Sequence, residues 1–473
     1  MNRRDFIKSA LWGAAFLGGG LHLREILAAP PFPTHEKTVF VNLLLEGGPD
    51  FRHLFVPPFD SNKQSYGYQY WSARATSHAL ELKDEAFEKR WQEYLRVERD
   101  GVVFGIHPTA AWLKEAFEAG KVAIVNNVLH SNTRDHAHSL LVLQSGDYAT
   151  SPHEVSRSGW GGRLAKAAQG NVLSMTPHIT MFCNGPHPTN ALGHDNSVVL
   201  SAATTRPFAL AYPDRLKTEP AYMGDDAVMA RALRSYYEAK RQELDANSPY
   251  ARFLTHEKAL REFGDAISKR LDNIAIPEPI KALYGSDAAT AMANKRFGEE
   301  LRNLYDSFAC ADLVNLRIAS LIYGGWDSHK WQKDSLEPKF KDIFGKDRGL
   351  DIFMRELKTT MPEAQERVVF AISGEFGRQL SSNGDRGTDH GRGNTVLLIG
   401  EKVKGGIYGE MFPQSEIPRF QQPGEDIEGR TSFERVFGEI CEWIQTGTAD
   451  TVFPKRKDSA AEQGVPFEQL FKK

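Results

Sequence analysis

Carboxylate and imidazole side chains stand at the ends of apolar segments in this chain of 473 residues. They occur at four such places: Asp50 after residues 38–45, Asp327 and His329 after residues 316–323, Glu375 after residues 367–372, and Asp389 with His390 before residues 395–399. Asp, Glu and His are the side chains with which proteins bind divalent metals. The pattern therefore predicts a metal site, for zinc, manganese, iron or calcium.

The spacing within this set indicates different roles. Asp327 and His329 are two residues apart, so in an extended segment both side chains face one ion. Asp50 follows a Gly-Gly-Pro turn, which lets the backbone approach a ligand closely. Asp389 and His390 are adjacent and point in different directions if extended. We expect His390 to be the ligand and Asp389 to orient a ligand from behind.

Three arginines are candidates for holding an anionic substrate, because guanidinium pairs with phosphate or sulfate through two hydrogen bonds. They are Arg134, Arg378 and Arg392. His107 stands just before a helical pattern, and we expect it to begin that helix rather than bind metal. We expect structural roles for the histidines without such a context: His53, His130, His178, His187 and His194.

The elements that position these residues alternate between strand-like and helical segments. Strand patterns at residues 38–45, 121–128, 316–323, 367–372 and 395–399 are separated by amphipathic helical stretches. This alternation predicts an α/β fold with a mainly parallel sheet sandwiched by helices. Ligands bind at the carboxyl ends of the strands in such sheets, which is where most of the candidate residues lie.

Two stretches interrupt this alternation and are predicted to be insertions. Residues 60–104 are polar and aromatic, with a charged helical part. Residues 205–300 contain a long charged stretch that predicts a solvated helical insertion.

Residues 1–29 have the pattern of a twin-arginine export signal. Arg3 and Arg4 precede a short, weakly apolar and glycine-rich segment at residues 10–20. A membrane-spanning helix needs about 20 apolar residues, so no transmembrane span is expected. We expect the twin-arginine translocase as a partner and the mature chain, residues 30–473, in the periplasm or outside the cell.

Composition excludes some classes of protein. The formal net charge is −3 at pH 7, whereas a nucleic-acid-binding surface needs a clustered basic excess; we expect no nucleic-acid partner. The three cysteines, Cys183, Cys310 and Cys441, are far apart and odd in number. They predict neither a disulfide scaffold nor a cysteine-based zinc site.

Seven short motifs occur in order: residues 45–50 (LEGGPD), 105–108 (GIHP), 134–136 (RDH), 324–329 (GGWDSH), 373–378 (SGEFGR), 388–391 (TDHG) and 403–409 (VKGGIYG). Together they resemble the exported family known as domain of unknown function 1501. That family is similar to the alkaline phosphatase and sulfatase superfamily. The resemblance covers nearly the whole mature chain and is weakest at residues 60–104 and 205–300.

The resemblance implies an alkaline-phosphatase-like fold and a two-metal hydrolase site. By this correspondence Asp50 and Glu375 bind one metal ion. Asp327, His329 and His390 bind the second. Two such ions clamp the attacking and leaving oxygens of an in-line displacement.

The chain departs from the family at the nucleophile. The superfamily places Ser or Thr at the start of a helix after the second strand, where this family usually has Arg-Ser-His. Here the residues are Arg134, Asp135 and His136. Asp135 can ligate metal or activate water, and Ser139, one helical turn later, is an alternative nucleophile. We expect His136, like Asp389, to support the ligands from a second layer.

Three interpretations follow. The first is an exported metal-dependent hydrolase of small phosphate or sulfate esters, in which Asp135, Ser139 or a metal-activated water attacks and Arg134 helps to hold the oxyanion. The second is a metal-binding or envelope-associated protein that keeps the fold without turnover, as the changed nucleophile position favours. The third is a structural exported protein without metal, which requires the ligand-type residues to coincide by chance.

Overall fold

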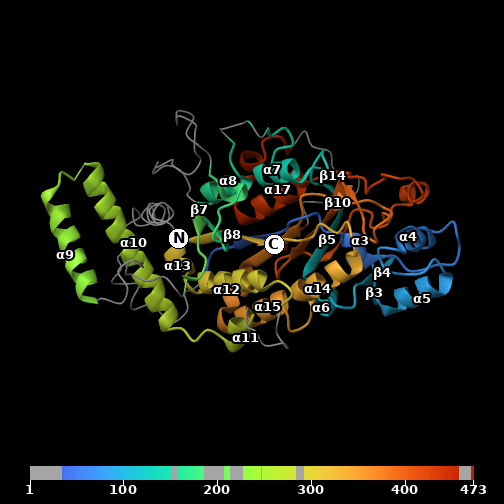
Figure 1. Cartoon of the computed structure of the whole chain (residues 1–473), viewed down its shortest axis with the longest axis horizontal. Coiled ribbons are helices and arrows are strands. Elements are labelled where there is room, and N and C mark those ends of the chain that lie inside the picture. The colour runs from blue at the N-terminus through green and yellow to red at the C-terminus, as the bar shows by residue number, and fades with distance from the viewer. Residues whose placement is uncertain are drawn as a thin grey trace.

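The computed structural model describes residues 35–151, 153, 157–185, 207–213, 227–246, 248–283, 292–456 and 470–472. The expected signal at residues 1–29, His187, His194 and parts of the 205–300 stretch lie outside these residues. The described chain is a mixed α/β structure around one large sheet, flanked by helices (Figure 1). The predicted α/β class with a mainly parallel sheet is confirmed.

The central sheet has nine strands in the order β13-β5-β12-β9-β1-β8-β6-β7, with β14 also paired to β5. Its strands are β1 (Val39–Leu45), β5 (Val122–Leu129), β6 (Asn171–Ser174), β7 (Pro207–Ala209), β8 (Leu316–Tyr323), β9 (Val368–Ser373), β12 (Gly393–Ile399), β13 (Gly406–Tyr408) and β14 (Thr431–Ser432). Strand β1 lies at the centre, parallel to β8 and β9. Such strands are buried on both faces, which explains their nearly continuous apolar sequences.

Strand β12 is antiparallel to both of its neighbours, β5 and β9. The other described pairs of this sheet are parallel. Because β12 is reversed, the segment before it lies at the edge where β5, β8, β9 and β1 end. His390 therefore meets the residues that follow those strands.

Helices cover both faces of the sheet (Figure 1). One layer contains α7 (His136–Ser145), α8 (Trp160–Ala167), α17 (Phe433–Ile444) and α18 (Ala449–Val452). The other contains α6 (Ala111–Glu118), α11 (Glu278–Ala282), α12 (Lys295–Ala309), α13 (Ala311–Val314), α14 (Gln332–Phe344), α15 (Gly349–Thr360) and α16 (Pro362–Arg367). Alternate residues of β1 enter the two cores: Phe40 packs with the first layer and Val41 with the second. The period of two along a strand produces this division.

Residues 60–104 form much of a compact unit at one end of the sheet. A small antiparallel sheet joins β2 (Phe55–Val56), β4 (Val102–Ile106) and β3 (Leu95–Arg99). The same unit contains α4 (Tyr66–Arg74) and α5 (Asp84–Glu93), and its hydrophobic cluster includes Tyr70 and Trp71. Nearby are α3 (Phe51–Leu54), the short pair β10 (Gly377–Arg378) and β11 (His390–Gly391), and a 3-10 helix at Gln414–Arg419.

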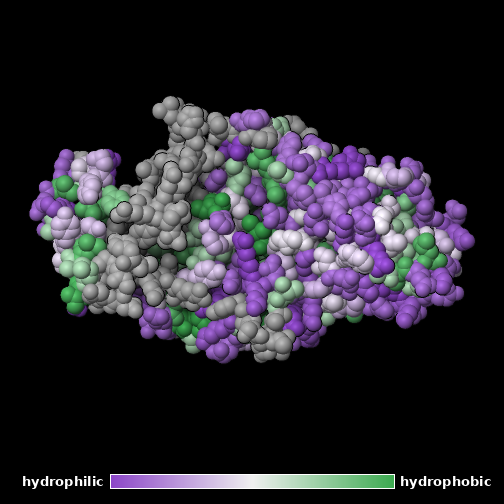
Figure 2. Space-filling view, in the orientation of Figure 1, coloured by the Kyte–Doolittle hydropathy of each residue, from purple (hydrophilic) through white to green (hydrophobic). Residues whose placement is uncertain are grey.

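At the opposite end of the molecule, α9 (Ala227–Glu243) and α10 (Pro249–Asp272) form a projecting helical pair (Figure 1). On the face shown in Figure 2, hydrophobic residues gather in small groups among hydrophilic ones. Within the described part of the chain, no helix has both the length and the apolar character needed to cross a bilayer.

Candidate metal centre

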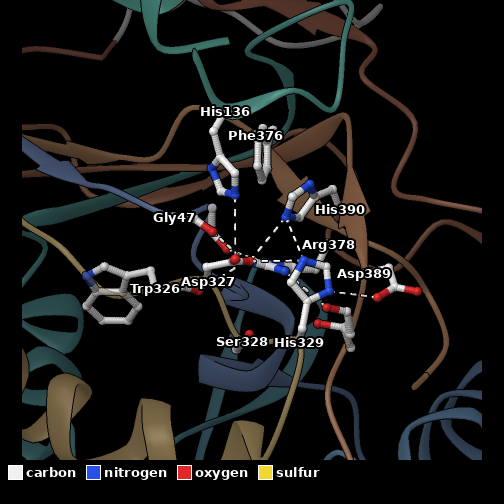
Figure 3. A network of polar contacts seen from close by, with 12 residues as sticks. Gly47, His136, Trp326, Asp327, Ser328, His329, Phe376, Arg378, Asp389 and His390 are labelled. Carbon is white, nitrogen blue, oxygen red and sulfur yellow. Dashed lines mark hydrogen bonds and ion pairs between the residues drawn. The ribbon is translucent and has the colours of Figure 1, made fainter. Parts of the chain in front are cut away.

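Three imidazoles surround the carboxylate of Asp327 at the ends of the central strands (Figure 3). Asp327 Oδ1 lies 3.1 Å from His390 Nε2 and 3.2 Å from His329 Nε2. Its other oxygen lies 3.6 Å from His136 Nε2. The Nε2 atoms of His329 and His390 are 2.9 Å apart. His136, Asp327 and His390 therefore form one group of ligand-type atoms, and the His329 imidazole lies beside Asp327 and His390.

The far side of each imidazole faces a hydrogen-bond acceptor. His136 Nδ1 lies 2.8 Å from Glu375 Oε1, and His329 Nδ1 lies 2.8 Å from Asp389 Oδ1. His390 Nδ1 lies 2.8 Å from the carbonyl oxygen of Arg134. Because ionised carboxylates and carbonyls only accept, each Nδ1 carries the proton and each Nε2 presents its lone pair inward. This is the arrangement that supports metal-bound histidines.

The distances also fit the size of a metal site. Bonds of about 2.0–2.1 Å in a tetrahedron place neighbouring ligand atoms roughly 3.3 Å apart. Asp327 Oδ1, His329 Nε2 and His390 Nε2 lie 2.9–3.2 Å from one another, close to this value, and His136 Nε2 lies 3.6 Å from the other oxygen of Asp327. Two lone pairs of His329 and His390 facing each other beside a carboxylate repel unless a cation lies between them. The residues present thus fit one divalent ion.

The sequence around each ligand explains its position. His136 is the first residue of α7, and Asp135 caps that helix by accepting from the His138 amide at 2.8 Å. Asp327 follows β8 and lies against the turn at Gly47, which has φ of +120°. A Cβ atom at Gly47 would lie 2.4 Å from the Asp327 nitrogen, so only glycine permits this approach.

Arg378 was expected to bind substrate, but its guanidinium is fully buried and bonded within the protein. It donates to the carbonyls of Gly48 and Thr388 at 2.7 and 3.0 Å, and also to that of Gly47. It donates to Asp327 Oδ1 at 2.8 Å. Arg378 therefore positions the Asp327 carboxylate and holds the surrounding loops together.

These contacts set the charges of the cluster. Desolvation favours a higher pKa for Asp327, but the hydrogen bond from Arg378 and the contact with His390 outweigh it and lower the pKa to about 2. Burial raises the pKa of Glu375 despite the hydrogen bond from His136. Burial lowers the pKa of His390, which favours the neutral imidazole that a metal requires.

Gln332, which the sequence pattern did not single out, joins the two loops that carry the ligands. Its side chain is fully buried. Its Oε1 accepts from the hydroxyls of Ser328 at 3.0 Å and Thr388 at 2.6 Å. Its Nε2 donates to Asp50 Oδ2 at 2.8 Å and to His53 Nδ1 at 3.2 Å. Ser328 lies between two ligands and Thr388 lies two residues before another, so Gln332 fixes both loops.

Asp50, an expected ligand, belongs to a separate buried network. Its Oδ1 accepts from the Arg52 amide at 3.0 Å, and its Oδ2 accepts from Arg74 at 2.5 Å. Glu375, another expected ligand, accepts from the Gly47 amide at 2.9 and 3.1 Å with its two oxygens. Glu375 also accepts from His136 Nδ1 and so supports that imidazole from behind. The supporting role was expected of His136, whose Nε2 instead faces Asp327.

The expected nucleophiles have structural contacts. Asp135 is exposed at the start of α7 and serves as its cap. The Ser139 side chain is fully buried, and its hydroxyl donates to the Thr133 carbonyl at 3.2 Å. The structure thus leaves Asp135, but not Ser139, accessible beside His136.

The remaining two arginines pair with Asp426, which the sequence pattern also missed. Arg134 donates to its Oδ2 at 2.7 Å, and Arg392 donates to both oxygens at 3.1 Å. The Asp426 side chain is 1% exposed, whereas those of Arg134 and Arg392 are 36% and 50% exposed. Asp426 holds the two guanidinium groups beside the segments of His136 and His390.

A second group of ligand-type residues contains His53, His107 and Glu337. Here the Nδ1 atoms face donors: the Gln332 amide group for His53, and the Thr109 backbone N–H, 3.3 Å away, for His107. The Nε2 atoms of His107 and His53 lie 3.2 and 3.7 Å from Glu337 Oε1, and Arg90 Nη2 lies 3.4 Å from His107 Nε2. Arg90 also donates to that carboxylate. This group therefore places two buried imidazoles and one guanidinium around the Glu337 carboxylate.

Residues 37–416 match the family described as "Protein of unknown function (DUF1501)". The matched range contains all four side chains of the cluster and the partners of their Nδ1 atoms. No curated protein matches the chain.

Proposed function

The chain belongs to the DUF1501 family of proteins of unknown function, and from the geometry of its site we propose that it is a metal-dependent hydrolase of phosphate or sulfate esters. The observation that carries this proposal is the orientation of three imidazoles, whose Nε2 lone pairs meet at the Asp327 carboxylate. We also propose the alkaline-phosphatase-like form of the α/β fold, which the ordered sequence motifs support.

The residues that would hold the ion are His136, Asp327, His329 and His390. A divalent ion there would supply Lewis-acid chemistry, polarising an ester oxygen and activating water. The side chains of His136, His329 and Asp327 are 38%, 39% and 42% exposed, so an ester can approach from solvent. Three neutral imidazoles and one carboxylate leave the site with a net positive charge when a divalent ion is bound.

The neighbouring residues fit the remaining needs of ester hydrolysis. Arg134 and Arg392 provide positive charge for the oxyanion from half-exposed positions. Asp135 is exposed beside His136 and is the residue that we propose removes a proton from the attacking water. Because Ser139 is buried inside α7, direct attack by water is favoured over a covalent serine intermediate.

The test is hydrolysis of an aryl phosphate and an aryl sulfate by the protein loaded with zinc or manganese. We expect metal-dependent turnover that His390→Ala abolishes and that Asp135→Asn lowers by about 10²–10⁴-fold in kcat. His138→Ala is the matched control, because His138 lies on the same helix but outside the cluster. Turnover that survives His390→Ala would contradict the proposal.

The second candidate function is metal binding without turnover. It is favoured by the structural use of Asp135 as a helix cap and by the burial of Ser139. A protein that binds metal through His390 but hydrolyses neither ester with any divalent ion would support this function.

We further propose export through the twin-arginine translocase to the periplasm or the exterior, on the basis of Arg3, Arg4 and the weakly apolar segment after them. Fractionation of cells that express the full chain tests this. Replacing both arginines with lysine should retain the protein in the cytoplasm, and undiminished export of that variant would refute the proposal.

A further inference from the structure

Asp50 is a buried carboxylate whose two oxygens are both engaged by protein donors. The residue is 1% exposed. Oδ1 accepts from the Arg52 amide, and Oδ2 accepts from Arg74 Nη1 and Gln332 Nε2. The two-metal layout implied by the sequence resemblance requires this carboxylate to bind the first ion. Its oxygens are instead committed to one guanidinium and two amide donors.

Arg74 is fixed in place by contacts beyond Asp50. Its side chain is 1% exposed. Its Nε donates to the Leu380 carbonyl at 2.9 Å, and its Nη2 donates to the Gln379 carbonyl at 2.5 Å. Three nitrogens of one planar group therefore bond to three fixed acceptors, and the guanidinium cannot swing away without losing all of them.

Arg378 adds a second positive charge close to Asp50. Its Nε donates to the carbonyl of Gly48, two residues before Asp50. A divalent ion at Asp50 would lie in a buried place beside two permanently charged guanidinium groups. Buried like charges repel strongly because little water screens them.

The second carboxylate expected for that ion is also engaged. Glu375 is fully buried; it accepts from the Gly47 amide with both oxygens and from His136 with Oε1. Turning it toward Asp50 would leave the Gly47 amide without an acceptor and would free the His136 imidazole to rotate. Neither carboxylate is therefore available for a first metal ion.

We propose that Arg74 is the built-in counter-ion of Asp50 and stands in place of a first metal, so that the chain takes one divalent ion, at the histidine cluster. The number of ions rests on the function proposed above, whereas the Asp50–Arg74 pairing does not. Arg74 belongs to α4, within the stretch expected to be an insertion. That stretch thus supplies the positive charge that the first metal ion would otherwise supply.

Metal stoichiometry and electron paramagnetic resonance with Mn²⁺ test this inference in the full chain. Equilibrium dialysis followed by elemental analysis should give one Mn²⁺ per chain, with the six-line spectrum of an isolated ion. Asp50→Asn should keep one equivalent and change the Mn²⁺ affinity by less than about threefold. His390→Ala should lose that equivalent. Asp342→Asn, which alters another buried carboxylate, controls for a general loss of stability.

The outcomes separate this inference from the proposed function. Two ions per chain, an exchange-coupled manganese spectrum, or loss of an ion in Asp50→Asn would overturn the inference and leave the hydrolase proposal standing. No ion bound to the wild-type chain would overturn the hydrolase proposal, while still agreeing with an Asp50 that is closed to metal. If Asp50→Asn does not fold, the wild-type stoichiometry and spectrum decide alone.

Discussion

Replacing Asp389 with alanine removes the acceptor that holds the Nδ1 proton of His329. The two atoms are 2.8 Å apart, and Asp389 also accepts from the Asn383 side chain at 2.9 Å. Without this acceptor the imidazole is free to rotate and to exchange its proton between the two nitrogens. We therefore expect Asp389→Ala to weaken metal binding without removing any ligand.

The structure sets the size of this effect. Loss of such a partner costs about 10–100-fold in metal affinity. The Asp389 side chain is 46% exposed, so water replaces part of the lost hydrogen bond and the lower half of that range applies. The carboxylate charge, roughly 7 Å from a divalent ion, adds about 1 kcal/mol in water, and salt reduces this term. We predict a loss of about 10–30-fold.

The assay is competition for Zn²⁺ against a chromophoric chelator near neutral pH. Asp385→Ala is the control, because Asp385 lies in the same loop, carries the same charge and pairs only with exposed Lys330, 3.4 Å away. Its loss should change the affinity less than about threefold. Equal effects of the two variants would refute the hydrogen-bond argument and leave only charge.

Three further predictions concern buried groups around the site and the core. Burial raises the pKa of Glu300 to about 7. The stability that its protonated form contributes is fully present below a pH of about 4.5 and is lost as the pH rises through 7. In urea unfolding at alkaline pH, Glu300→Gln should therefore be more stable than the wild type by up to about 3 kcal/mol. Unfolding curves that stay parallel across pH would contradict this. Gln332→Leu leaves two buried hydroxyls without an acceptor, so it should lower the free energy of unfolding in urea by about 2–4 kcal/mol and weaken zinc binding. An unchanged zinc affinity would show that Gln332 does not fix the ligand loops. Arg74→Met leaves Asp50 without its counter-ion and should cost about 3–5 kcal/mol, much of which the double variant with Asp50→Leu recovers; equal losses in the two would argue against the pair.

The strands could be predicted because their signal is local. The apolar segment at residues 316–323 coincides with β8 (Leu316–Tyr323), and the segment at 367–372 lies within one residue of β9 (Val368–Ser373) at each end. The direction of β12 could not be predicted in this way. Strand direction depends on pairing with β5 and β9, which are far away in the sequence.

The candidate site was partly visible in the sequence. Asp327, His329 and His390 come together, as their places beside strands indicate. The sequence did not show that His136 faces the Asp327 carboxylate and that Glu375 lies behind His136. This arrangement depends on the direction in which His136, the first residue of α7, points. That direction depends on the helix cap and on tertiary packing, which the spacing of residue types does not encode.

The buried network behind the site was not visible. Arg74 comes from a stretch that interrupts the strand and helix pattern, and it reaches Asp50 only because α4 packs beside the turn after β1. Gln332 begins α14, and its type gives no hint that all its hydrogen bonds are used inside the protein. Contacts of this kind join segments distant in sequence and have no local pattern.

X-ray absorption spectroscopy of the zinc-loaded full chain is the most direct test of the central claim. We predict about three imidazole nitrogens and one carboxylate oxygen at about 2.0–2.1 Å, with one imidazole lost in His390→Ala. A first shell made only of oxygen, or a spectrum that His390→Ala leaves unchanged, would contradict a metal centre at His136, Asp327, His329 and His390.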